Sequence, residues 1–289
     1  MRLRTAVLLA GTAATAGALI EPHFPVLRRQ VVPVLRPGSE QLAVLHLSDL
    51  HLLPRHGRRS RWIRGLAQLD PDVVVVTGDL WSSLSSMPLL GATLAALTAD
   101  GTPGLFVPGN NDYYTPLPPS FVGYLTGGRP QRHGPDLPWQ RAAAMLESLG
   151  WTDLTHRRTT MSLRGLDVTF TGTDDAHLRR DRYALVQGRV AGDLGIGVTH
   201  TPARRILDAF VADGHQVVLA GHTHGGQVRL PAIGALVTNC DLDRARARGL
   251  SRHGQSWLHV SAGLGTSPYA PIRLCCRPEA SLLTLTAVR

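Results

Sequence analysis

The chain has 289 residues, of which 43% are hydrophobic and 18% charged, and this balance excludes wholesale disorder because it supplies a packed core. Its formal net charge of +9 comes from arginine alone, since lysine is absent, and this bias is weak support for a nucleic-acid partner. Three cysteines exclude the framework of a disulfide-stapled secreted module and provide no C-x-x-C motif.

An apolar segment opens the chain. Arg2 and Arg4 precede an uncharged run over residues 5–20, slightly shorter than the ~20 residues that a spanning helix usually needs. A membrane anchor and a cleaved signal segment both fit residues 1–22, and we favour the anchor. We therefore expect a cell-membrane protein with a single N-terminal anchor and an extracytoplasmic main domain.

Residues 23–40 are rich in proline, and we predict that they link the anchor to one domain over residues 41–289. In this domain short apolar runs end in polar turns, the pattern of an α/β protein. The runs that we expect to form buried strands cover residues 42–47, 73–76, 105–107, 168–171, 194–199 and 217–220. Helices are predicted around residues 62–69, 89–97 and 141–149, and further strands at 257–260 and 281–285 favour two packed sheets over one wide sheet.

A long loop interrupts this pattern after the third run. Residues 113–140 contain many prolines and glycines with scattered aromatic side chains, a composition that breaks regular structure. Long loops in compact domains are usually functional or disordered. We predict a lid or a surface insertion at this position.

Five of the runs end in a turn that carries aspartate, asparagine or histidine. A lone histidine is more often a core residue than a ligand, but here the polar residues share one position relative to the strands. Ligands bind beyond the carboxyl ends of strands in open α/β sheets, so these side chains can converge. Glycines at 78, 109 and 221 precede polar residues and permit close backbone approach. Mixed carboxylate, imidazole and amide donors suit manganese, iron or zinc.

Five motifs follow one another along the chain: D-x-H at Asp49 and His51, G-D at Asp79, G-N-x-D at residues 109–112, a strand-end His200, and G-H-x-H at His222 and His224. As an ordered set they resemble the motifs of the calcineurin-like metallophosphoesterase superfamily. Residues 261–267 and 271–273 resemble the tail of its bacterial membrane-associated branch. The resemblance implies a four-layer α/β/β/α sandwich of two mixed sheets, with a dinuclear metal site at the strand ends.

The resemblance also implies the ligands and the reaction. One metal ion would be held by Asp49, His51, Asp79 and His224, and the second by Asp79, Asn110, His200 and His222, with Asp79 bridging both. Two manganese, iron or zinc ions roughly 3.5–4 Å apart would activate a bridging hydroxide that attacks a phosphate ester or anhydride. The catalytic residues that we expect are Asn111, Asp112, His200 and His222.

Asn111 departs from the family pattern, since many relatives carry histidine at the third position of the G-N-x-D motif. An amide cannot donate a proton to a leaving group as a general acid. We therefore expect a phosphodiester or pyrophosphate substrate, whose leaving group is a more stable anion. A lipid-linked molecule or a nucleotide sugar would match this chemistry and the expected membrane partner.

Other polar residues have open roles. The arginines between residues 55 and 64 would contact lipid phosphates or a second substrate phosphate, or form a solvated helix face. Asp112, Asp174 and Asp175 would orient ligand histidines, cap helices or close turns.

Two other hypotheses for the function stay open. The chain would be a nuclease of the same superfamily, or a metal-binding scaffold in which the change to Asn111 has abolished catalytic turnover.

Overall fold

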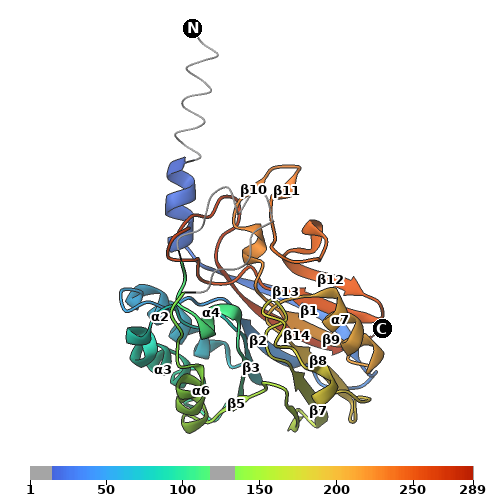
Figure 1. Ribbon diagram of the computed structural model, residues 1–289. Helices are drawn as coiled ribbons and strands as arrows, with labels where there is room; N and C mark the ends of the chain where they lie inside the picture. Colours follow the sequence, from blue (N-terminus) through green and yellow to red (C-terminus); the bar gives the residue numbers. More distant parts are fainter. Residues whose placement is uncertain (1–14, 118–133, 289) are drawn as a thin grey trace.

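Two six-stranded mixed sheets lie face to face at the centre of the protein (Figure 1), in the computed structural model that describes residues 15–117 and 134–288. The first sheet has the order β1-β14-β2-β3-β4-β5 and the second β12-β13-β9-β8-β7-β6. The strands of the first sheet are β1 (Val26–Leu35), β2 (Leu42–Leu47), β3 (Val73–Thr77), β4 (Gly104–Val107), β5 (Trp151–Asp153) and β14 (Glu279–Ala287). Those of the second are β6 (Arg158–Leu163), β7 (Leu166–Gly172), β8 (Leu194–Val198), β9 (Val217–Ala220), β12 (Gly249–His253) and β13 (Ser256–Val260).

Helices cover the outer face of each sheet. The first sheet carries α2 (Gly57–Arg64), α3 (Met87–Ala95) and α6 (Trp139–Ser148), and the second carries α7 (Arg204–Ala212) (Figure 1). The single turn α4 (Asn110–Tyr113) follows β4, and a small hairpin joins β10 (Arg229–Leu230) to β11 (Gly234–Ala235). Short 3-10 segments cover Glu21–His23, Gly65–Leu69, Leu84–Ser86, Tyr183–Leu185, His224–Gly226 and Arg244–Arg246.

Three apolar clusters fill the spaces between these layers. Val74 and Val76 of β3 pack under the helices of the first sheet, whereas Val73 and Val75 face the second sheet. This alternation follows from the two-residue period of a strand. β9 alternates in the same way between the middle cluster and α7. The predicted four-layer α/β/β/α sandwich of two mixed sheets is therefore confirmed.

The strand directions bring the polar turns to one edge. β2, β3 and β4 run parallel in the first sheet, as do β7, β8, β9 and β13 in the second. Within each sheet the turns are joined by backbone hydrogen bonds from Asp49 N to Gly78 O and from Gly221 N to His200 O, each 2.9 Å. His222 N donates across the two sheets to the Asp49 carboxylate at 3.1 Å.

The segment predicted to be a linker contains a strand. β1 pairs in parallel with β14 at the edge of the first sheet and buries Val32 and Leu35 in the middle cluster. The prolines that suggested a linker are compatible with this position, because an edge strand leaves one side unpaired and tolerates Pro33. The prediction that residues 113–140 form a lid or a surface insertion is not tested, since residues 118–133 lie outside the described part.

The predicted localisation, a cell-membrane protein with a single N-terminal anchor and an extracytoplasmic domain, is wrong. Over residues 15–117 and 134–288, no helix is long and apolar enough to cross a membrane. The helical residues 15–20 lead directly into Glu21–His23 and then into β1. Residues 1–14 of the predicted anchor lie outside the described part of the chain.

Candidate metal centre

Four side chains that follow β2, β3 and β9 point toward one another. The ligand atoms of Asp49, His51, Asp79 and His224 all lie within 4.8 Å of each other. His51 Nε2 is 3.3 Å from both His224 Nε2 and Asp79 Oδ2, and His224 Nε2 is 3.4 Å from Asp49 Oδ1. Two ring nitrogens at this separation repel through their lone pairs unless a proton or a cation lies between them. Two nitrogens facing two carboxylate oxygens therefore form the donor set of a cation site.

His200 and His222 extend this group beyond Asp79. His200 Nε2 lies 3.6 Å from Asp79 Oδ2, the same oxygen that faces His51. His222 Nδ1 in turn lies 3.3 Å from His200 Nε2. The Asp79 carboxylate thus stands between two groups of histidines, which is the position that a bridging ligand requires.

The second ring nitrogen of each histidine is held by another group. His200 Nδ1 lies 2.7 Å from Thr77 O, His224 Nδ1 3.2 Å from Gly265 O, His51 Nδ1 3.2 Å from Ser82 Oγ, and His222 Nε2 3.3 Å from Asn239 O. A carbonyl can only accept, so it fixes the proton on the nitrogen that faces it. In His222 and His224 this leaves the inward nitrogen without a proton when the ring is neutral, which is the arrangement of histidine ligands in known metal sites.

Two buried oxygens of the predicted ligands have no hydrogen-bond donor. They are Asp49 Oδ1 and Asn110 Oδ1, the latter on the first residue of α4. Buried polar atoms are nearly always paired in native structures. Unpaired oxygens that accompany inward-facing imidazoles fit metal ligands, so the residues present match a metal site.

Burial keeps three of the histidines neutral. It lowers the pKa of His51 to about 4 and that of His222 to about 3, and it holds the pKa of His224 well below its ordinary value. Since only the neutral ring has a free lone pair, these three side chains are in the form that binds metal ions near neutral pH.

The other three ionisable groups are Asp49, Asp79 and His200. They carry the protons that a metal ion would displace and the negative charge that it would neutralise. Burial raises the pKa of Asp49 to about 6. Burial also opposes ionisation of Asp79 and of His200, but their mutual attraction prevails. It lowers the pKa of Asp79 and, together with Asp49, raises the pKa of His200 to about 9. At neutral pH an ionised Asp79 therefore faces a protonated His200.

The backbone is strained where these side chains converge. Five of the predicted ligands have positive φ angles: Asp49 (50°), His51 (42°), Asp79 (55°), His222 (69°) and His224 (49°). Non-glycine residues rarely adopt this region, and such strain concentrates at functional sites. A Cβ at Gly78 would lie 2.5 Å from Gly109 N, so that glycine is required by close backbone approach as well as by its φ of 78°.

Asn111 and Asp112 hold the Asp79 loop. The Asn111 backbone and side-chain amides donate to the two oxygens of Asp79 at 2.8 and 2.7 Å. The Asp112 carboxyl accepts from the backbone N–H groups of Asp79, Leu80 and Gly109 at 2.7–2.8 Å. Burial and the charge of Asp79 raise the pKa of Asp112 to about 8. Both side chains therefore act on the position of Asp79.

The three aspartates considered for orienting histidine rings have other partners. Asp112 accepts from backbone amides, Asp174 accepts from Tyr113 and Arg180, and Asp175 accepts from Thr201 and Leu178 N. Carbonyl and hydroxyl groups face the histidine rings instead, and the contacts of Asp112 and Asp175 with backbone amides agree with the alternative that these residues close turns. No sequence motif marks a backbone carbonyl, so this part of the site could not be found from residue types.

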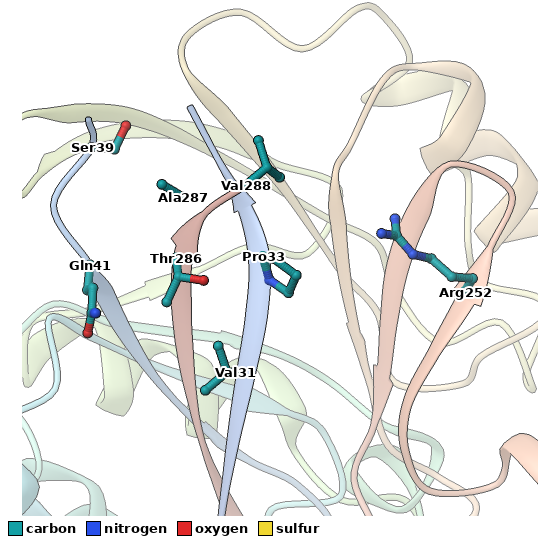
Figure 2. A pocket seen from close by; sticks show the side chains of 8 residues that line it. All are labelled: Val31, Pro33, Ser39, Gln41, Arg252, Thr286, Ala287 and Val288. Carbon is teal, nitrogen blue, oxygen red and sulfur yellow. The ribbon is translucent and has the colours of Figure 1, made fainter. Parts of the chain in front are cut away.

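A separate pocket of about 790 Å³ lies at the opposite end of the first sheet (Figure 2). Its lining includes Gln41, which precedes β2, and Thr286 and Ala287 at the end of β14. β14 runs antiparallel to β2, with Leu285 opposite Leu42, so this end is remote from the turn at Asp49. None of the residues that line the pocket belongs to the predicted site.

Comparisons with known proteins agree with this geometry. Residues 42–226 match the family model of the calcineurin-like phosphoesterases. The uncharacterized metallophosphoesterase YkoQ of Bacillus subtilis is 27% identical over 245 residues, which cover 84% of this chain and 83% of that protein. A bovine transmembrane protein with a metallophosphoesterase domain is 27% identical over an alignment of 302 residues, and the chain spans 63% of its length. Phosphodiesterase YaeI of Escherichia coli is 39% identical over 69 residues, 24% of each chain.

The family match covers more than half of the chain, and the aspartates and histidines whose arrangement fits a metal ion lie within the matched residues. The chain therefore belongs to the calcineurin-like phosphoesterases and is a metal-dependent phosphoester hydrolase.

Proposed function

We propose that the chain hydrolyses a phosphodiester or pyrophosphate bond with two metal ions. Asp49, His51, Asp79 and His224 would hold one ion, and Asp79, Asn110, His200 and His222 the other. The two ions would supply a nucleophile at neutral pH and neutralise the phosphoryl oxygens during in-line attack. The mixed nitrogen and oxygen donors favour manganese, iron or zinc.

The observation that carries the choice of substrate is the position of Asn111. Its amide donates to the Asp79 carboxylate at 2.7 Å, and an amide cannot protonate a leaving oxygen. A simple alkoxide leaves poorly without such a proton. A phosphate or an activated diester leaves as a stable anion, and this chemistry fits the site best.

Arg59 supports a substrate with a second phosphate. Its Nη1 donates to Leu50 O at 3.0 Å, which places the guanidinium next to His51. Burial, followed by the charges of Arg273 and Arg55, lowers the pKa of Arg59 to about 10, so the side chain stays charged at neutral pH. No ion pair in residues 15–117 or 134–288 includes Arg59. An arginine without an acidic partner is suited to bind phosphate.

We infer from these features that the substrate is a diphosphate, of which a nucleotide sugar and a lipid-linked diphosphate are the two chemical classes to test. The name of the E. coli relative, a phosphodiesterase, agrees with phosphodiester chemistry, although the similarity covers 24% of the chain.

The test is hydrolysis by the full chain, reconstituted with Mn²⁺, of an alkyl phosphomonoester, an aryl phosphodiester, a nucleotide sugar and a lipid diphosphate. We expect turnover of the diester and the diphosphates, lost in Asp79→Asn. His177→Gln is a second variant, because the His177 ring lies 4.7 Å from that of His222 and is a rival proton donor. Preference for the alkyl monoester, or a large loss of rate in His177→Gln, would overturn the leaving-group argument.

A further inference from the structure

Arg273 is a fully buried arginine in the loop that joins β13 to β14. No ion pair over the described residues includes it, and its Nε has no hydrogen-bond partner there. Burying a cation without a carboxylate partner lowers the free energy of unfolding. The residue also lies outside the family match, which ends at residue 226. Its burial therefore calls for an explanation in its own contacts.

The guanidinium joins two segments of backbone, residues 262–265 and Cys276. Nη2 donates to Ala262 O and Gly265 O, each at 2.7 Å, and to Gly263 O at 3.1 Å. Nη1 donates to Cys276 O at 3.2 Å. One side chain thus fixes the direction of four carbonyl groups, which the planar fork of an arginine allows and a lysine ammonium does not.

The segment that Arg273 holds, residues 262–265, packs directly behind the metal site. Leu264 N donates to Ser48 O at 3.0 Å and Gly265 N to Asp49 O at 2.6 Å. A Cβ at Gly263 would lie 2.6 Å from the Asp49 Cβ, so no side chain separates the two segments. The backbone of Asp49 is therefore fixed by the segment that Arg273 orders.

The same segment faces His224. Gly265 O lies 3.2 Å from His224 Nδ1, and Arg273 Nη2 lies 3.4 Å from that nitrogen. Gly265 O can only accept, and Arg273 can only donate, so the two groups favour opposite tautomers of the ring. Arg273 Nη2 lies closer to Gly265 O, at 2.7 Å, than to His224 Nδ1, at 3.4 Å. Its hydrogen bond to Gly265 O therefore holds this carbonyl next to the ring. The Nδ1–H tautomer leaves Nε2 free to face Asp49 Oδ1.

We propose that Arg273 is a positioning residue of the metal centre. It orders residues 262–265 so that Gly265 O fixes the Nδ1–H tautomer of His224 and so that Asp49 and His224 present their ligand atoms together. This role rests on the proposed metal site but not on the substrate. The metal centre is thereby completed by a part of the chain that follows the matched family domain.

The first experiment measures the His224 tautomer in the metal-free wild-type chain by long-range ¹H–¹⁵N NMR. We expect a protonated Nδ1 and an unprotonated Nε2. A ring protonated on Nε2 would overturn the proposal, because Nδ1 would then accept from Arg273. This measurement needs neither a variant nor a substrate.

The second experiment measures Mn²⁺ affinity by calorimetry for Arg273→Gln, Arg273→Lys and the matched control Arg277→Gln. Arg277 is exposed on the same loop and donates to Phe24 O. Loss of groups that orient metal ligands typically costs about 10–100-fold in affinity, and we expect this for both Arg273 variants and no change for the control. Urea unfolding checks that each variant is folded. A folded Arg273 variant with wild-type affinity would contradict the proposal, and if Arg273→Gln does not fold, Arg273→Lys and the tautomer decide. A wild-type chain that binds Mn²⁺ but hydrolyses no diester or diphosphate would refute the proposed function alone.

Discussion

The contact between Gly221 and Ser48 gives a prediction whose size can be worked out from distances. A Cβ at Gly221 would lie 1.8 Å from Ser48 Oγ and 2.6 Å from Asp49 Oδ2. The Ser48 hydroxyl donates to Asp49 Oδ2 at 2.6 Å, so Gly221→Ala must displace it and break this bond. Overpacking costs about 1–3 kcal/mol and a hydrogen bond to a charged group about 1.5–3 kcal/mol, which together make a loss of about 2.5–6 kcal/mol in the free energy of unfolding.

The assay is urea unfolding of the chain in EDTA, so that bound metal contributes nothing to the measured stability. Ser48→Ala removes the hydroxyl that the new methyl group would hit, and Gly221→Ala should then cost at least about 1 kcal/mol less in the double variant. Gly57→Ala is the matched control, because a Cβ there meets no atom within 4 Å, and its effect should stay within about 1 kcal/mol. A cost below about 1 kcal/mol for Gly221→Ala, or strict additivity with Ser48→Ala, would refute the reasoning.

Three further predictions concern protons and substrates. Since the pKa of His200 is raised to about 9 and that of Asp49 to about 6, Mn²⁺ binding should release about one proton at pH 7 and about two at pH 5, measured by calorimetry in buffers of different ionisation enthalpy. Asn111→His should raise the hydrolysis rate of an alkyl phosphomonoester by at least about tenfold, because it restores a general acid, with little change for an aryl diester. Arg59→Gln should raise the KM for a diphosphate substrate about tenfold and leave the KM for an aryl diester unchanged, because only the former has a second phosphate.

Each of these has an outcome that contradicts it. Binding heats that do not depend on the buffer would mean that no proton leaves the site on metal binding. An Asn111→His variant with unchanged monoester hydrolysis would show that proton donation at this position does not limit the rate. Arg61→Gln is the control for Arg59, since Arg61 lies exposed on the same helix, and equal effects of the two variants would point to general electrostatics.

The parts of the structure that depend on side-chain pattern could be predicted from the sequence. The run over residues 42–47 forms β2 with the same bounds, and the turns after β2, β3 and β9 meet as expected because parallel strands end at one edge. The prolines, including Pro33, led us to predict a linker where the structure has an edge strand, because proline occurs both in loops and in edge strands. The strand forms by pairing with β14, more than 240 residues later in the chain, which the local sequence does not reveal.

The contacts that orient the ligand side chains could not be predicted from the sequence, for a different reason. The ring nitrogens of His200 and His224 face the carbonyls of Thr77 and Gly265, and every residue has a carbonyl. Arg273 appeared in the sequence only as part of a tail motif, and nothing in residue type or spacing placed it behind His224. Such contacts follow from the tertiary path of the backbone, so the sequence predicts the ligands better than what holds them.

The strand order of the first sheet has a consequence for how the protein is made. β14 lies between β1 and β2 and pairs with both, so β1 and β2 do not pair with each other. During synthesis, which adds about 5–20 residues per second, residues 26–47 leave the ribosome many seconds before residues 279–287. The first sheet cannot close in that interval, and residues 262–265 are not yet behind Asp49. A nascent chain that already contains every predicted metal ligand therefore still lacks the backbone contacts of residues 262–265 to Ser48 and Asp49. We expect such a chain to bind metal ions less tightly than the complete one.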